Sequence, residues 1–161
     1  MQRAFLLVLV LAGAFVWLTS GSLPSVVASH FGPGGVANGF MGKSTYTSLM
    51  LAVVVAVPAL IALSGQLVRV LPVQLVNLPN KQYWLAPQRR AATLEALSSM
   101  SVAFATALVV FLCFVHWLVV RANASQPARL PEASLIVGLV VFGVATVLWL
   151  LLLFRRFGRV P

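Results

Sequence analysis

Four long apolar stretches, separated by loops that hold nearly all of the charges, constrain this chain more than any other feature. A helix that crosses a membrane needs about 20 predominantly apolar residues. The sequence therefore predicts a single all-α membrane domain of four transmembrane helices. Between them we expect a small external loop or hairpin at 21–43 and a cytoplasmic interfacial loop at 71–87. The four helices are expected at about 4–20, 45–70, 88–120 and 133–155.

The composition excludes several classes of protein. Of 161 residues, 61% are hydrophobic and 8% are charged, whereas a soluble domain keeps about a quarter of its residues charged. Aspartate is absent, and Glu95 and Glu132 are the only acids. This excludes a Ser-His-Asp triad, a carboxylate pair for glycoside hydrolysis and an acidic cage for magnesium or calcium. We therefore expect no enzymatic activity and no cofactor.

The basic residues predict the orientation of the helices. The net charge of +9 could suggest nucleic acid, but the cations flank apolar segments. We therefore interpret them as contacts with anionic lipid headgroups and expect no nucleic-acid partner. Since cytoplasmic loops carry the excess of Lys and Arg, both termini are predicted to be cytoplasmic. The cytoplasmic set is Arg3, Arg69, Lys81, Arg89, Arg90, Arg155, Arg156 and Arg159, and the external set is Lys43, Arg121 and Arg129.

Local signals inside the apolar segments refine this prediction. The first segment follows Arg3 and could alternatively be a cleaved signal peptide. In the second segment, Pro58 should kink the helix and Pro72 should stop it. In the fourth segment, Gly138 and Gly143 are expected to permit close helix packing.

The loop 21–43 predicts a hairpin on the outer membrane surface. Residues 25–31 include β-branched and small side chains typical of a strand, and residues 36–40 could return as a second strand. Gly32-Pro33-Gly34-Gly35 between them is a strong turn signal. The simplest role for this hairpin is a structured cap over the helices, in which the ring of His30 donates to a backbone carbonyl.

The cytoplasmic loop has the features of an interfacial elbow between the second and third helices. Aromatic side chains favour the headgroup zone, and each cation near anionic headgroups contributes about 1 kcal/mol. A docking surface for a partner is the alternative. The interface is predicted to comprise Asn77, Pro79, Asn80, Tyr83, Trp84, Arg89 and Arg90.

These two loops resemble a known family. The run LPSVVASHF followed by the glycine turn is similar to the signature of a small bacterial membrane domain of unknown function. That domain is also found at the front of the immunity protein for the sporulation-delaying toxin. The stretch NLPNKQYWLAPQRR resembles a further segment of some members. The resemblance implies a bacterial inner-membrane protein with an external loop. The matching loop residues are Leu23, Pro24, His30, Phe31, Gly32, Asn38 and Gly39.

Four residues could carry metal chemistry on the external side. His30, Cys113, His116 and Glu132 are ligand types suited to zinc or copper. Their spacing matches no known metal motif, so a metal or quinone site using His30 and His116 is an alternative hypothesis. Both histidines could also sense pH. The simpler interpretation of His116 is a side chain that is hydrogen-bonded to the loop above it.

The sequence favours a non-catalytic membrane protein that works through protein contacts. It would be an accessory subunit of a larger membrane complex, or an immunity or signalling factor like the family it resembles. Its expected partners are the lipid bilayer and other membrane proteins or a second copy of itself. A small transporter or channel is a further alternative. The centres of the predicted helices lack the ionisable groups that proton-coupled transport needs.

Overall fold

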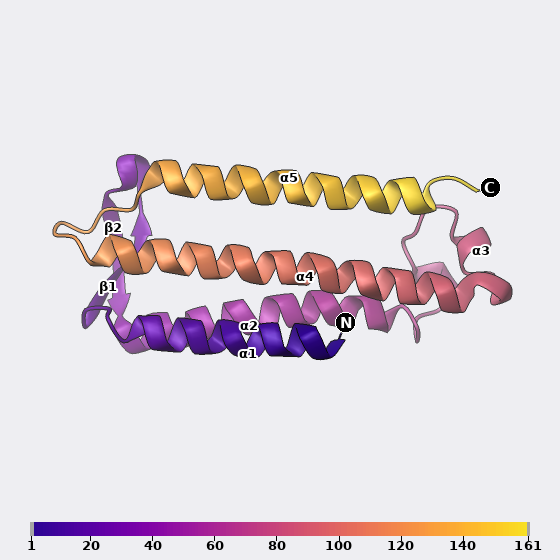
Figure 1. Ribbon diagram of the computed structural model, residues 1–161, viewed down its shortest axis with the longest axis horizontal. Helices are drawn as coiled ribbons and strands as arrows, with labels where there is room; N and C mark the ends of the chain where they lie inside the picture. Colours follow the sequence, from indigo (N-terminus) through magenta and orange to yellow (C-terminus); the bar gives the residue numbers. More distant parts are fainter. Residues whose placement is uncertain (1, 161) are drawn as a thin grey trace.

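The computed structural model describes residues 2–160 and consists mainly of four long helices with one small sheet (Figure 1). Each of the four helices is long and apolar enough to cross a membrane. The predicted all-α architecture with a small hairpin is therefore confirmed. The elements in chain order are α1 (Gln2–Ser20), β1 (Val26–Phe31), η1 (Pro33–Gly35), β2 (Ala37–Gly42), α2 (Lys43–Leu67), η2 (Val73–Leu75), α3 (Lys81–Trp84), α4 (Pro87–Asn123) and α5 (Glu132–Phe157).

Helix α4 is the centre of the bundle. Helices α1 and α2 pack against each other and against one side of α4, and α5 packs against its other side (Figure 1). The strands and the loop 124–131 lie at one end, which we call the hairpin end. The short helix α3 and its flanking loops lie at the other, which we call the α3 end. Both chain termini are directed toward the α3 end.

The helix boundaries differ from the predicted ones by no more than three residues. Helix α2 was predicted to continue to 70 but ends at Leu67, because the backbone N–H groups of Arg69 and Val70 turn back to the carbonyls three residues earlier. The helix runs through the buried Pro58 as one element. Helix α4 extends to Asn123, beyond the predicted 120. Glu132 was assigned to a loop but begins α5, where its charge suits the helix N-terminus.

The main core lies between α1, α2 and α4. Buried residues of α1 recur every three or four positions, so one face of this helix is built into the bundle. Small side chains such as Ala62 and Ala105 allow the helices to approach closely. At Gly65, an added Cβ would lie 2.7 Å from the Ser101 hydroxyl oxygen. The core residues are Phe5, Leu9, Ala12, Val16, Val54, Ala62, Val102, Ala105 and Val109.

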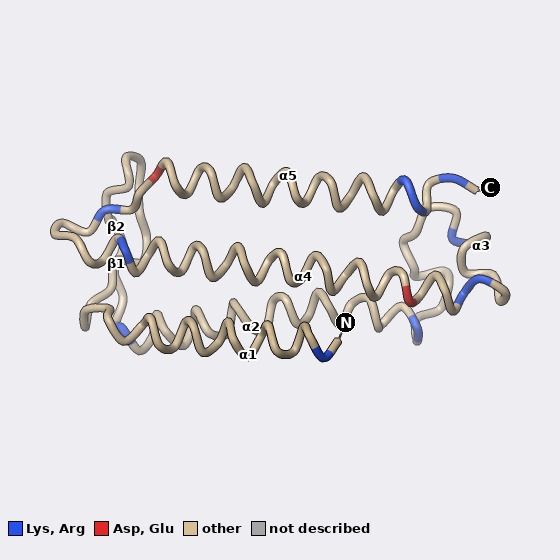
Figure 2. The backbone as a smooth tube through the Cα atoms, viewed as in Figure 1, with Lys and Arg blue, Asp and Glu red and all other residues tan. Residues whose placement is uncertain are grey.

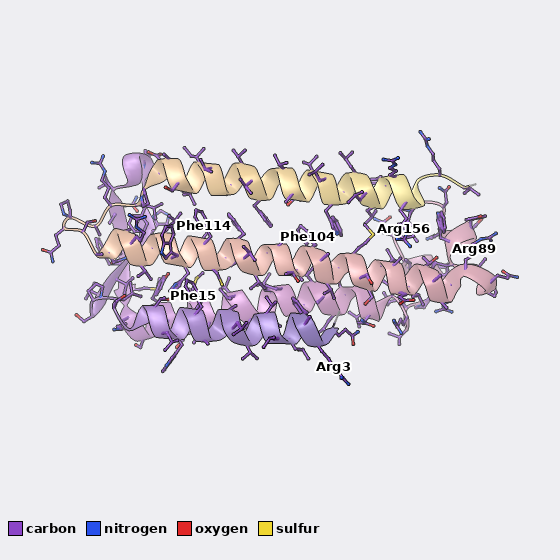
Figure 3. The ribbon with its side chains drawn as sticks, in the orientation of Figure 1. Arg3, Phe15, Arg89, Phe104, Phe114 and Arg156 are labelled. Carbon is purple, nitrogen blue, oxygen red and sulfur yellow. The ribbon has the colours of Figure 1, made fainter. Side chains whose placement is uncertain are left out.

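Aromatic side chains dominate the contact between α4 and α5. Phe104 and Phe114 project from α4 toward α5 (Figure 3), and Phe111 stacks on Phe142 with 4.5 Å between ring centroids. Gly138 lies against the ring of Phe114, where a side chain would clash. The packing role predicted for Gly138 is therefore confirmed. The same prediction for Gly143 is wrong, because this residue faces away from every neighbouring side chain.

Among residues 2–160, the charged residues lie at the two ends of the bundle and at the N-terminus of α1 (Figure 2). Seven of the eleven basic residues lie at the α3 end, Arg3 lies at the N-terminus of the shorter helix α1, which points toward that end, and Lys43, Arg121 and Arg129 lie at the hairpin end. The apolar middle of the bundle carries no Lys, Arg, Asp or Glu among residues 2–160 (Figure 2). This segregation is typical of a protein whose middle is in hydrocarbon.

Candidate functional site at the hairpin end

The hairpin is a short antiparallel pair with an irregular register. Val26 pairs with Gly42 and Phe31 with Ala37, and the register shifts on both sides of His30. Gly34 and Gly35 in the connecting turn have φ angles of 74° and 72°, a conformation that favours glycine. A side chain at Gly35 would also collide with the carbonyl of Leu130. The predicted Gly-Pro-Gly-Gly turn is thus confirmed.

Asn123, the last residue of α4, holds the outer edge of β1. Its side-chain oxygen accepts the backbone N–H of Ala28 at 2.8 Å, and its amide nitrogen donates to the carbonyl of Ala28 at 2.9 Å. The side-chain amide therefore takes the place of a third strand. The same nitrogen also donates to the carbonyl of Val119. These bonds fix the hairpin to the central helix.

The loop between α4 and α5 holds the tip of the hairpin. The backbone N–H of Leu130 donates to the carbonyl of Gly35 at 2.8 Å, and the Arg129 guanidinium donates to the carbonyl of Gly34 at 3.0 Å. Val36 and Arg129 also form an isolated antiparallel bridge. We call the hairpin and this loop, residues 23–42 and 124–131, the cap. The strands of the cap contact α2 and α4.

The inner side of the cap is a small core of its own. Leu23 and Val27 are buried with Tyr46 and Val119, and Phe31 packs against them. Two residues of the predicted loop signature, Leu23 and Phe31, therefore have a structural role in this core. Pro24 is exposed, the N–H of Gly32 donates to the carbonyl of Val36 within the turn, and Gly39 lies against the Cβ of His30.

The outer side of the cap exposes apolar side chains. Phe40 is 62% exposed and Val26 is 59% exposed, and Val36 is exposed beside the turn. His30 is exposed as well, and its Nδ1 is hydrogen-bonded to the side-chain oxygen of Asn38. The prediction that this ring donates to a backbone carbonyl is therefore wrong. Exposed apolar groups on a rigid support are typical of a contact surface.

His116 lies beneath the cap, fully buried where α1, α2 and α4 meet. Its Nε2 is 2.8 Å from the Thr19 hydroxyl and its Nδ1 is 2.9 Å from the Tyr46 hydroxyl. The Thr19 hydroxyl donates its one proton to the Phe15 carbonyl at 2.6 Å, so it accepts from Nε2–H. Tyr46 then donates to Nδ1, and its ring stacks on the imidazole. For a neutral imidazole, this pattern places the proton on Nε2.

This arrangement corrects the interpretation of His116. The predicted partner was the loop above the helix, but the actual partners are side chains of α1 and α2. Both ring nitrogens are already bonded, so neither faces an open ligand position. Within residues 2–160, no group of three or more His, Cys, Asp or Glu side chains is placed to hold a metal ion. Cys113 packs beside the main core, and His30 lies on the exposed side of the cap.

The predicted cytoplasmic interface lies at the α3 end and is built around Phe157. Asn80 and the Trp84 indole both donate to the Phe157 carbonyl, at 3.0 and 2.9 Å. The Trp84 ring also meets the buried Phe157 ring edge to face. Sequence reasoning missed Phe157, because nothing in its local pattern shows that the end of α5 returns to this loop.

The other predicted residues of this interface have local roles. Pro79 and Asn80 form the turn before α3, while Asn77 is exposed. The Arg89 guanidinium stacks over the Tyr83 ring at 3.9 Å, and Arg90 donates to the carbonyl of Arg69. The loop is therefore a folded elbow that joins α2, α4 and α5.

Comparison of the chain with protein-family models, with curated proteins and with solved structures gave no match.

Proposed function

We propose that this chain is a non-catalytic, multi-pass membrane protein that binds a partner protein outside the cytoplasm through the hairpin of its cap. The orientation rests on the charge segregation. Seven basic residues at the α3 end, and Arg3 at the N-terminus of α1, favour a cytoplasmic position for that end and for both termini. The cap then lies on the external surface of a bacterial inner membrane.

The observation that carries the proposal is a rigid cap with an apolar outer side. Two hydrogen bonds between the Asn123 side chain and the backbone of Ala28, together with the pairing of Leu130 with Gly35, hold its backbone. A rigid surface loses little conformational freedom on binding, and exposed aromatic groups such as Phe40 are typical anchors of protein interfaces. The immunity or signalling role implied by the family resemblance would use this surface.

A photo-crosslinking amino acid at Phe40, in cells at native expression, tests the proposal. We expect a discrete crosslinked product of larger mass. Gln126 is a matched control, because it is exposed at the same end but lies in the loop 124–131 rather than on the hairpin. Equal products from both positions, or none from Phe40, would contradict binding through the hairpin.

An accessory-subunit role is the second candidate, and helix α5 favours it. This helix packs mainly on α4, and none of its most apolar window is buried within the chain. Its outward side chains, such as Val140 and Leu151, could pack against a helix of another protein. A crosslinker at Val140 that captures a membrane protein, with none captured at Phe40, would favour this candidate over the first.

The orientation has its own test. With Cys113 replaced by alanine, a cysteine at Ser29 should react with a membrane-impermeant thiol reagent added to intact cells. A cysteine at Gln88, near the start of α4, should react only after the membrane is opened. The reverse pattern would place the cap in the cytoplasm and refute the proposed topology.

A further inference from the structure

A pocket of about 800 Å³ opens at the hairpin end between α1 and α2. It lies where α1 ends and α2 begins, next to the first and last residues of the hairpin. It is separate from the outer side of the cap, where Phe40 is exposed. Its polar lining comprises Ser20, Ser25, Lys43, Ser44, Thr47 and Ser48.

One hydroxyl group of this pocket is buried without a partner within residues 2–160. Ser20 is 2% exposed, and its hydroxyl oxygen is buried without a hydrogen bond. Thr47 is buried as well, and its hydroxyl makes none of the described side-chain hydrogen bonds. By contrast, the hydroxyls of Thr106 and Thr146 in other helices donate to carbonyls of their own helix. The unsatisfied buried hydroxyl of Ser20 indicates that a polar group belongs beside it.

The charges at the pocket favour an anion. The Lys43 ammonium donates one hydrogen bond to the Gly21 carbonyl at 2.7 Å, which leaves two of its three protons for a ligand. Helix α2 starts here with Gly42 as its N-cap, so no side chain caps the positive end of its dipole. Neither acid of the chain, Glu95 or Glu132, lines the pocket.

The open side of the pocket is apolar. Trp17 lines it and is 66% exposed, and Leu18 beside it is also exposed. Both belong to α1, which is apolar enough to cross a membrane. A ligand here therefore meets one cation and several hydroxyl groups at one end and apolar side chains at the other. We infer that this pocket binds the phosphate headgroup of an anionic phospholipid, with its acyl chains beside Trp17.

Native mass spectrometry of the full chain, titrated with phosphatidylglycerol in mixed micelles, tests this inference. Lys43→Gln should weaken binding about five- to tenfold, because one cation beside an anionic headgroup is removed. Ser48→Ala should weaken it as well, and since Ser48 is exposed and makes no described side-chain hydrogen bond, this change should leave the fold intact. Phosphatidylcholine, whose headgroup has no net charge, should bind more weakly.

Arg121→Gln is the matched control, because it removes one positive charge from the same end but outside the pocket. Equal loss of affinity in Lys43→Gln and Arg121→Gln would overturn the inference in favour of general surface attraction. Unchanged affinity in both Lys43→Gln and Ser48→Ala would overturn it too. Inorganic phosphate that displaces the lipid at equal concentration would overturn the lipid assignment and assign the pocket to free phosphate.

Discussion

Removal of one hydroxyl group, by Tyr46→Phe, should measurably destabilise the bundle. The Tyr46 hydroxyl donates to Nδ1 of His116 at 2.9 Å and so joins α2 to α4. The phenylalanine ring can keep the stacked position, whose centroid lies 5.8 Å from that of the imidazole. The substitution therefore removes the hydrogen bond and little of the packing.

The size of the effect follows from the burial of His116. Interhelical hydrogen bonds in membrane proteins contribute about 0.6 kcal/mol on average and up to about 1.7 kcal/mol. Since His116 is 0% exposed, water cannot replace the lost donor at Nδ1. We therefore expect a loss near the upper end, about 1.5 kcal/mol in the free energy of unfolding.

Reversible unfolding in mixed micelles of mild and denaturing detergent gives the required free energies. Tyr83→Phe is the matched control, because the Tyr83 hydroxyl makes no described side-chain hydrogen bond and its ring lies under Arg89. It should change the unfolding free energy by less than about 0.5 kcal/mol. Equal effects of Tyr46→Phe and Tyr83→Phe would refute the reasoning. A double-mutant cycle of Tyr46→Phe with His116→Phe should show that the free energy lost in Tyr46→Phe comes from the interaction between these two side chains.

Two further substitutions test the cap and the packing of α5. Asn123→Ala should speed hydrogen exchange at the backbone amide of Ala28 at least about tenfold, because both backbone groups of Ala28 lose a partner. Unchanged exchange would show that the Asn123 side chain does not hold β1. Gly138→Leu should cost about 1–3 kcal/mol of stability by pushing against Phe114. Gly143→Leu, at a position with open space, should change stability by less than about 0.5 kcal/mol, and equal costs in the two variants would contradict the packing.

Much of the fold is readable from the sequence because its signals are local. The four apolar segments predict the four helices, and the Gly-Pro-Gly-Gly run predicts the hairpin turn that contains Gly34 and Gly35. The segregation of Lys and Arg to the two ends is equally visible. Helix ends were off by a few residues, as at Leu67, because backbone hydrogen bonds in the last turn determine where a helix stops.

The candidate site was not predictable in detail because its contacts join distant parts of the chain. His116 was recognised as a candidate, but its partners Thr19 and Tyr46 lie on two other helices. An apolar segment predicts a helix, but it does not predict which face of that helix contacts which neighbouring helix. The same limit explains why the role of Asn123 at Ala28 was missed. It also explains the wrong prediction for Gly143.

The central claim is that this chain works by binding another protein through the hairpin. The most direct test is purification of the chain in mild detergent at native expression level, followed by the mass of the intact particle. We predict a stoichiometric larger partner that is lost when Phe40, the most exposed aromatic side chain of the hairpin, is replaced by aspartate. A chain that purifies alone, or a complex that survives Phe40→Asp unchanged, would contradict the claim.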